Sequence, residues 1–176
     1  IYFLGYPDTG MPYEESFLRR LYDGCRVSAS RWGRTETWRP DGQDFHFMRS
    51  GCHSTYTAAS VLRDLSDVLA LVNPDTVYVT APGDCHGDHD ALGRFTTQAV
   101  AAMENPPALY YYLIHADRTD IWPERDAERF RLPPMAADHP LLRCAAERRP
   151  LPDGFPPAEK YSLIQSYTSQ DPAAYN

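Results

Sequence analysis

The 176-residue sequence lacks any run of 18 or more apolar residues, the length that a helix needs to cross a bilayer. It also lacks a stretch in which basic residues alternate with aromatic ones, and its formal charge is −7 at pH 7. We therefore expect neither a transmembrane segment nor a nucleic-acid partner. The sequence gives no indication of the oligomeric state.

The four cysteines, Cys25, Cys52, Cys85 and Cys144, include no C-x-x-C pair. Two disulfides would fit an exported protein and four separate thiols would fit a cytosolic one, so the cysteines leave the compartment open. Cys85 adjoins His86, which raises the idea of a thiolate ligand or nucleophile, but the sequence offers no evident base for that thiol.

What is present is ordinary globular composition, with 43% hydrophobic and 12% aromatic residues, enough for a single domain over 1–176. Apolar spacing predicts helices over 13–22, 58–72 and 92–103, and again over 158–170. β-branched and aromatic runs predict strands over 1–6, 76–81 and 108–114. This alternation indicates an α/β fold with a mostly parallel sheet covered by helices.

Two segments show no clear periodicity. Residues 24–54 mix Trp, Phe, Gly and Arg, and either an ordered flap near a ligand or a surface loop burying its own aromatics would account for them. Residues 123–157 hold eight of the 16 prolines, which predicts an extended excursion. Substrate choice would reside in residues 24–54 and 116–157.

Chemistry is concentrated in Gly83-Asp84-Cys85-His86-Gly87-Asp88-His89-Asp90, between a predicted strand and a predicted helix. Imidazole is the commonest protein ligand for zinc, and a neighbouring carboxylate can orient the ring or bind the ion. Ligands of open α/β sheets bind at the carboxyl ends of strands, where this turn would lie. A solvated acidic loop, with Asp88 as a helix N-cap, is the alternative. His115, at the end of another predicted strand, is more readily explained as a structural residue.

A family resemblance rests on three stretches in order along the chain. Asp84-x-His86-x-Asp88-His89-x-Ala91 resembles the second metal motif of the PIG-L/LmbE-like zinc-dependent deacetylases. Residues 3–11, with Asp8-Thr9-Gly10-Met11, look like that family's strand and substrate loop, and the end at Ser169-Gln170 looks like its C-terminal helix. The family's first motif, of the Ala-His-Pro-Asp-Asp-Glu type, is absent, so we expect this chain to be the C-terminal part of a longer deacetylase domain.

The resemblance implies a Rossmann-like three-layer α/β/α fold and a Zn²⁺ cofactor bound by His89. It implies that His86 acts on the oxyanion or the leaving amine, that Asp88 orients His86, and that Asp8 binds sugar hydroxyls, although capping a helix would also explain Asp8. The expected activity is removal of an acetyl group from an N-acetylglucosamine-type sugar or glycoconjugate. The alternatives are a non-catalytic carbohydrate-binding relative and an amidase acting on thiol conjugates.

Overall fold

The structure is a computed structural model that describes residues 1–9, 12–24, 29–115 and 162. The chain divides into two compact units, Ile1–Cys144 and Ala145–Asn176. In the second unit only Ser162 is described, in helical conformation. The account below concerns the described residues of the first unit. The segments predicted over 116–157 and 158–170 lie outside the described residues, apart from Ser162.

Two parallel strands form the sheet, β1 (Thr76–Thr80) and β2 (Ala108–Tyr112). Their register pairs Thr76 with Ala108 and Thr80 with Tyr112. α4 (Gly87–Ala101) connects the two strands, as a parallel pair requires. Both strands and the helix were predicted from composition and spacing, and these predictions are confirmed.

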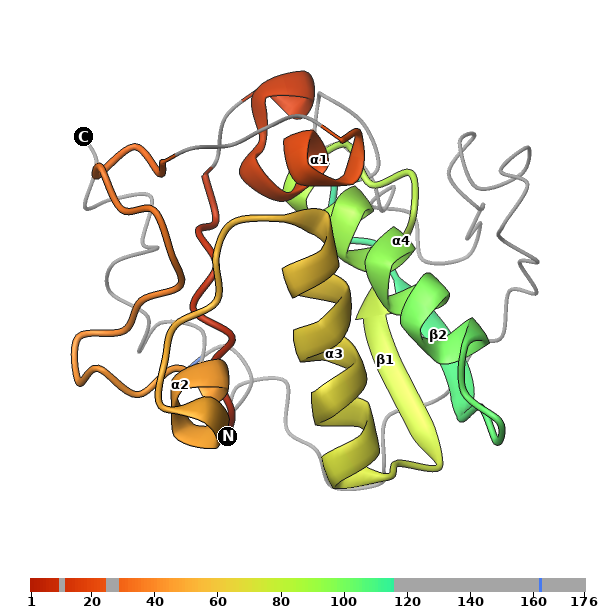
Figure 1. Cartoon of the computed structure of the whole chain (residues 1–176). Helices are drawn as coiled ribbons and strands as arrows, with labels where there is room; N and C mark the ends of the chain where they lie inside the picture. Colours follow the sequence, from red (N-terminus) through yellow and green to blue (C-terminus); the bar gives the residue numbers. More distant parts are fainter. Residues whose placement is uncertain (10–11, 25–28, 116–161, 163–176) are drawn as a thin grey trace. The chain divides into compact units, whose positions relative to one another are not determined.

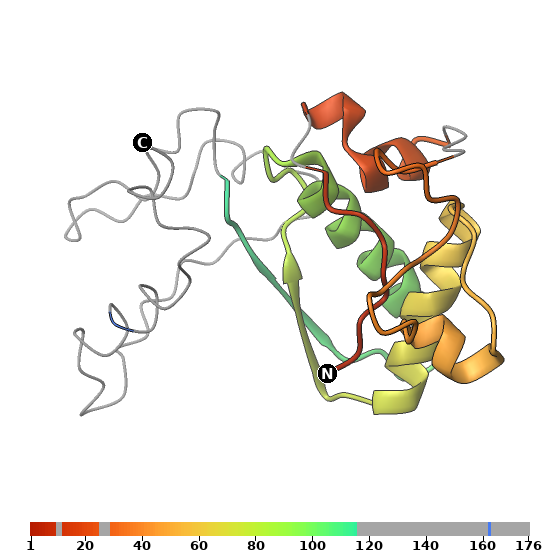
Figure 2. The same cartoon turned by 90° about the vertical axis from the view of Figure 1, so that its left-hand side faces the viewer.

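Two long helices, α3 (Ala58–Val72) and α4, lie on the same face of this sheet (Figures 1 and 2). Thr57 caps α3 by accepting a hydrogen bond from the Ser60 N–H, and Asn73 ends it in the left-handed conformation. A buried apolar cluster joins α1 (Phe17–Tyr22) to α3 and α4, and it consists of Phe17, Leu18, Leu21, Tyr56, Val61, Ala91 and Phe95. This packing fixes the N-terminal half of α4, which carries the His-Asp motif.

The strand predicted over residues 1–6 is wrong. These residues are extended but belong to no strand, and Ile1, Tyr2 and Phe3 are exposed. Among the described residues, their only backbone hydrogen bonds are those that the Phe3 and Gly5 carbonyls accept, from Phe45 and Trp38. Gly5 has a φ of 78°, and a side chain there would collide with Trp38, so the chain bends where a strand would run straight.

The helix predicted over 13–22 is split into the 3-10 turn η1 (Tyr13–Glu15) and α1. Ser16 breaks it with a ψ of 140° and is fully buried. Its side chain lies against Gly87, where an added Cβ would be 2.8 Å from the Ser16 Cβ. Close packing against the start of α4 therefore overrides a continuous helical pattern in this segment.

Residues 29–54 form an ordered loop around one short helix, α2 (Phe45–Ser50), and contain a single bridge residue, Glu36, which pairs with Thr55. Asp44 caps α2 and also bonds Thr37 and His53. Asp64 on α3 is buried and accepts hydrogen bonds from Tyr6 at 2.7 Å and Ser54 at 2.6 Å. The loop thus packs on α3 through a buried polar network.

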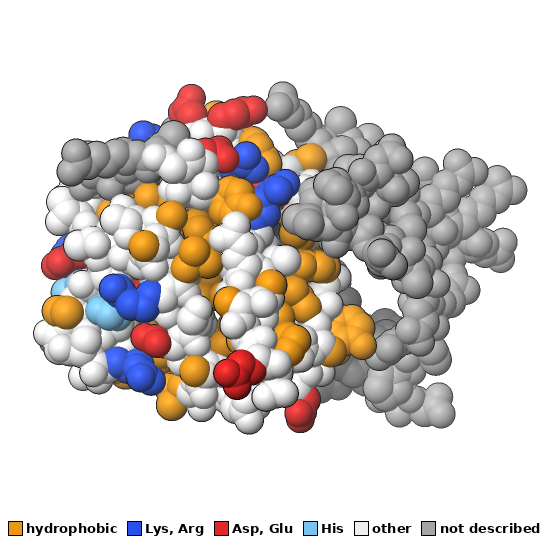
Figure 3. Space-filling view, turned by 45° about the vertical axis from the view of Figure 1, so that its right-hand side comes forward, with side chains coloured by type: hydrophobic (Ala, Val, Ile, Leu, Met, Phe, Trp, Pro, Cys, Tyr) orange, Lys and Arg blue, Asp and Glu red, His pale blue; other side chains and the backbone are white. Residues whose placement is uncertain are grey.

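The architecture is α/β with parallel strand pairing, as predicted. Among the described residues, helices cover one face of the sheet, and the three-layer Rossmann-like arrangement stays a prediction. No helix in the described part of the chain is long and apolar enough to cross a membrane. On the face in Figure 3, basic side chains lie beside acidic ones and do not gather into one basic patch.

Candidate metal centre

The His-Asp motif occupies the turn that leads from β1 into α4. The chain leaves β1 at Thr80, bends at Gly83 with a φ of 95°, and enters α4 at Gly87. His86 is the N-cap residue of α4, and His89 is in its first turn. The turn lies at the carboxyl end of a parallel strand, the position that the sequence predicted.

Three imidazole rings stack at this edge of the sheet. The rings of His86 and His89 lie 4.3 Å apart between centroids, and His115 is 5.8 Å from the first and 5.4 Å from the second. His115 follows β2, and its carbonyl accepts a hydrogen bond from the Cys85 N–H at 2.9 Å. The parallel pairing of β1 and β2 therefore brings His115 close to His86 and His89, which are far from it in the sequence.

Asp84 anchors the cluster. It is fully buried, and its Oδ2 accepts hydrogen bonds from the backbone N–H groups of Ile114 at 3.0 Å and His115 at 3.1 Å. Its Oδ1 accepts one from the His86 N–H at 2.9 Å and lies 3.5 Å from Nδ1 of His89. Burial would raise the pKa of Asp84, but the contact with His89 and the three N–H donors outweigh it and lower that pKa.

The same contact acts on His89. The nearby Asp84 carboxylate raises the pKa of His89, while burial opposes the rise. At 3.5 Å the two atoms form an ion-pair contact, longer than a good hydrogen bond. A carboxylate facing Nδ1 favours the tautomer with a proton there, which leaves Nε2 with a lone pair to offer.

Asp88 does not orient His86 as expected. Its carboxylate accepts three hydrogen bonds, from the Thr9 N–H and hydroxyl at 2.9 Å each and from the Leu18 N–H at 2.7 Å. Nδ1 of His86 is buried and makes no hydrogen bond with any described residue. Asp88 therefore ties the loop that carries Asp8 and the first turn of α1 to α4.

Asp8 was weighed as a helix cap, and that interpretation is wrong. Thr9 and Asp88 accept the N–H groups at the start of α1, from Phe17 and Leu18, whereas the Asp8 side chain is 77% exposed. Its Oδ1 lies 3.7 Å from Nε2 of His86. Asp8 is thus directed at the imidazole cluster from the loop opposite α4.

Asp8, His86 and Asp88 could together hold a metal ion, since one ligand atom from each lies within 4.8 Å of the others. Two ligands of a tetrahedral zinc, each about 2.0–2.1 Å from the ion, are about 3.4 Å apart, close to the 3.7 Å between Asp8 and His86. Asp88 fits less well because three of its roughly four acceptor positions are already used. The predicted ligand, His89, lies outside this group, and its assignment to the metal stays a prediction.

Sequence reasoning underestimated three residues. The alternative of a solvated acidic loop would expose Asp84 and Asp90 to water, yet both are fully buried. Asp90 accepts hydrogen bonds from Tyr13, Arg19 and Arg94 and stabilises the turn instead of facing the imidazoles. His115 was interpreted as structural, although its place at the end of a strand next to β1 was the signal that puts it in the cluster.

Comparison with known proteins finds no match to this chain, whether among family models, curated proteins or solved structures. A functional interpretation therefore rests on the motif and on the geometry of this cluster.

Proposed function

We propose that this protein is a zinc-dependent hydrolase that removes an N-acyl group, such as acetyl, from an N-acetylglucosamine-type sugar or glycoconjugate. The observation that carries the proposal is the stacking of His86, His89 and His115 beside buried Asp84 at the carboxyl edge of β1 and β2. Imidazole and carboxylate are the donors that catalytic zinc sites use, together with an open position. The family resemblance of the motif supports the same chemistry.

His89 would hold the metal through Nε2, because Asp84 occupies the side of the ring that carries Nδ1. Asp8 would add a carboxylate donor or accept hydrogen bonds from sugar hydroxyls, since it is exposed and near His86. A bound zinc ion supplies Lewis acidity and lowers the pKa of a bound water to about 7.

His86 is placed to act on the substrate. Its ring stacks on that of His89, its Nδ1 has no hydrogen-bond partner in the described part of the chain, and its Nε2 faces Asp8. An imidazolium in this position can donate a hydrogen bond to a developing oxyanion or a proton to the leaving amine. Asp88 serves as a positioning residue, because it holds Thr9, the neighbour of Asp8.

The test measures metal content and acetate release in the purified full-length protein and in its His89→Ala, His86→Ala and Asp8→Asn variants. We expect about one zinc per chain, loss of zinc in His89→Ala, and retained zinc with roughly hundredfold slower turnover in His86→Ala. His53→Ala is the matched control, because His53 is bonded to Asp44 and takes no part in the cluster.

Loss of zinc in His86→Ala and Asp8→Asn, with zinc retained in His89→Ala, would move the metal to the group of Asp8, His86 and Asp88. A protein that binds no zinc and releases no acetate would overturn the proposal and favour a non-catalytic carbohydrate-binding protein. Release of the acyl group from thiol conjugates, without release from N-acetylglucosamine compounds, would favour the amidase alternative.

A further inference from the structure

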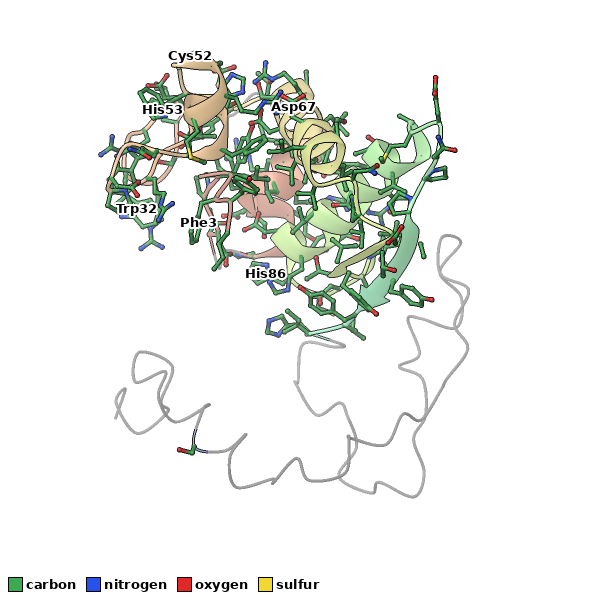
Figure 4. All side chains as sticks on the ribbon, turned by 90° about the horizontal axis from the view of Figure 1, so that it is seen from below. Phe3, Trp32, Cys52, His53, Asp67 and His86 are labelled. Atoms are coloured by element: carbon green, nitrogen blue, oxygen red, sulfur yellow. The ribbon has the colours of Figure 1, made fainter. Side chains whose placement is uncertain are left out.

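A hollow of about 200 Å³ lies beside the candidate metal centre, on the loop 29–54. Its walls include Tyr6, Pro7, Trp32, Arg34 and Trp38. Pro7 directly precedes Asp8, and the Asp8 carboxylate lies 3.7 Å from Nε2 of His86. The hollow therefore begins next to a residue that contacts the imidazole cluster. In Figure 4, Trp32, Phe3 and His86 follow one another along one side of the described part of the chain. None of the three clustered histidines lines the hollow.

The aromatic walls are unusually open to solvent. Trp32 is 65% exposed and Trp38 is 43% exposed, whereas indole rings are normally well buried. One guanidinium group lies over each indole ring, with Cζ of Arg31 4.6 Å from the Trp32 centroid and Cζ of Arg34 4.3 Å from the Trp38 centroid, so the other face of each ring is not covered by it. Exposed aromatic faces of this kind are typical of surfaces that bind a ligand with an apolar face and a polar edge.

The charge of the hollow is positive, although the whole chain carries a formal charge of −7. Arg34 lines it, and none of the described residues that line it carries a carboxylate. Neither Arg31 nor Arg34 forms an ion pair with any described residue, so their N–H donors remain available for an anion. Arg19 and Arg94, by contrast, are paired with Asp90.

An adjoining hollow of about 230 Å³ shares Arg34 and Trp38 but is also lined by Glu36 and His53. The Glu36 carboxylate would repel an anion there, so the hollow next to Pro7 is the better anion site. Its 200 Å³ is smaller than the roughly 300–1,000 Å³ of pockets that enclose whole drug-sized ligands. A single ring would fill it.

We propose that the hollow formed by Trp32, Arg34 and Trp38 binds a sugar ring that carries an anionic group, with the ring on the indoles and the anion on the guanidinium. The inference goes beyond the proposed function, because this binding needs neither a metal nor the histidines. A ring bound here would lie next to Asp8, as a charged neighbour of the sugar that is deacetylated.

Titration calorimetry on the purified protein tests this with three probes: methyl β-D-glucuronide, glucose 6-phosphate and the neutral methyl β-D-glucoside. We expect at least one of the two anionic probes to bind measurably more tightly than the neutral one. Which of the two anionic probes binds more tightly shows whether the hollow prefers a carboxylate or a phosphate. Arg34→Gln should weaken that binding by about tenfold or more, the effect of losing charge-assisted hydrogen bonds. Trp32→Ala should weaken it severalfold without disturbing the core, because Trp32 is exposed.

Arg39→Gln is the matched control, since Arg39 packs on Phe3 and pairs with Asp41 outside the hollow. Binding should be the same in Arg39→Gln and in His89→Ala as in the wild type. Equal affinity for the neutral and anionic sugars, absence of binding by all three probes, or an unchanged affinity in Arg34→Gln would each overturn the proposal. A loss of binding in His89→Ala would also overturn it, by placing the anion at the metal centre.

Discussion

Oδ1 of Asp84 lies 3.5 Å from Nδ1 of His89, while Oδ2 of the same carboxylate is held by the N–H groups that follow β2. The carboxylate is therefore fixed by the second strand and presented to a ring on the helix that leaves the first. Because Asp84 is fully buried, it cannot turn away to solvent without breaking these bonds. Nδ1 of His89 therefore faces a carboxylate whose position is fixed by the backbone before any ligand binds.

This relationship predicts the effect of Asp84→Asn. An amide in place of the carboxylate removes the charge that faces the imidazole, so the ring loses both its orientation and part of its basicity. We expect zinc affinity to fall by about 10- to 100-fold, the usual effect of removing a carboxylate behind a ligating histidine. Competition with a zinc chelator measures the change.

Asp44→Asn provides the control for Asp84→Asn, because Asp44 is an equally buried carboxylate bonded to a histidine outside the cluster. It should lower stability and leave zinc affinity unchanged. Equal zinc affinity in Asp84→Asn and the wild type would contradict the orienting role of Asp84.

Asp88→Asn should reduce stability more than it reduces metal content. The substitution removes an acceptor from the Thr9 and Leu18 donors, and an unsatisfied buried donor costs about 1–3 kcal/mol. Urea denaturation of the two proteins measures this difference. Asp41→Asn, at an exposed ion pair with Arg39, should change the free energy of unfolding by less than about 0.5 kcal/mol.

Zinc content of Asp88→Asn decides between two roles for this carboxylate. Retained zinc is the expected result, since most acceptor positions of Asp88 already serve the protein. Complete loss of zinc in a variant that remains folded would show that Asp88 is a ligand.

Gly93→Ala should destabilise the protein although alanine favours helices by about 1 kcal/mol over glycine. A Cβ at Gly93 would collide with the Thr80 carbonyl oxygen and would lie 2.9 Å from Pro82. We expect a net loss of about 1–3 kcal/mol, as for other overpacked positions, seen as a lower midpoint of thermal unfolding.

Gly51→Ala is the control for Gly93→Ala, because it measures the cost of a side chain where there is no steric collision. A Cβ at Gly51 meets nothing within 4 Å, and the only penalty comes from its φ of 75°. Its cost should therefore be about 1 kcal/mol. A stabilising effect of Gly93→Ala would mean that α4 can move away from β1, and the close helix–strand contact would then be wrong.

The parts of the fold that were predictable depend on local pattern. The apolar spacing of α3 and the β-branched run of β1 reflect burial on one face, which a sequence records directly. The segment 1–6 has a strand-like composition, but composition cannot report that Gly5 bends and that few backbone partners are present. Strand formation needs a neighbour, and that neighbour is a tertiary property.

The location of the candidate site was predictable from the sequence, but the roles of its individual residues were less so. His86 and His89 are close in sequence, and the strand-to-helix turn brings them together with little help from the rest of the chain. The burial of Asp84 and Asp90 depends on donors from the residues that follow β2 and from α1, which are distant in sequence and carry no periodic signal. A carboxylate such as Asp88 could orient an imidazole, but in this structure it accepts hydrogen bonds from the N–H groups of Thr9 and Leu18 instead.

The parallel pairing of β1 with β2 has a consequence for how the centre assembles. Alternate residues of a strand point to opposite sides, so sliding β2 by one position against β1 would turn the side chain of His115 away from His86 and His89. The same shift would move the N–H groups of Ile114 and His115 away from Asp84, the carboxylate that faces His89. Zinc binding through His89 would then be weaker in molecules whose two strands are misaligned, so zinc affinity would report on the strand register.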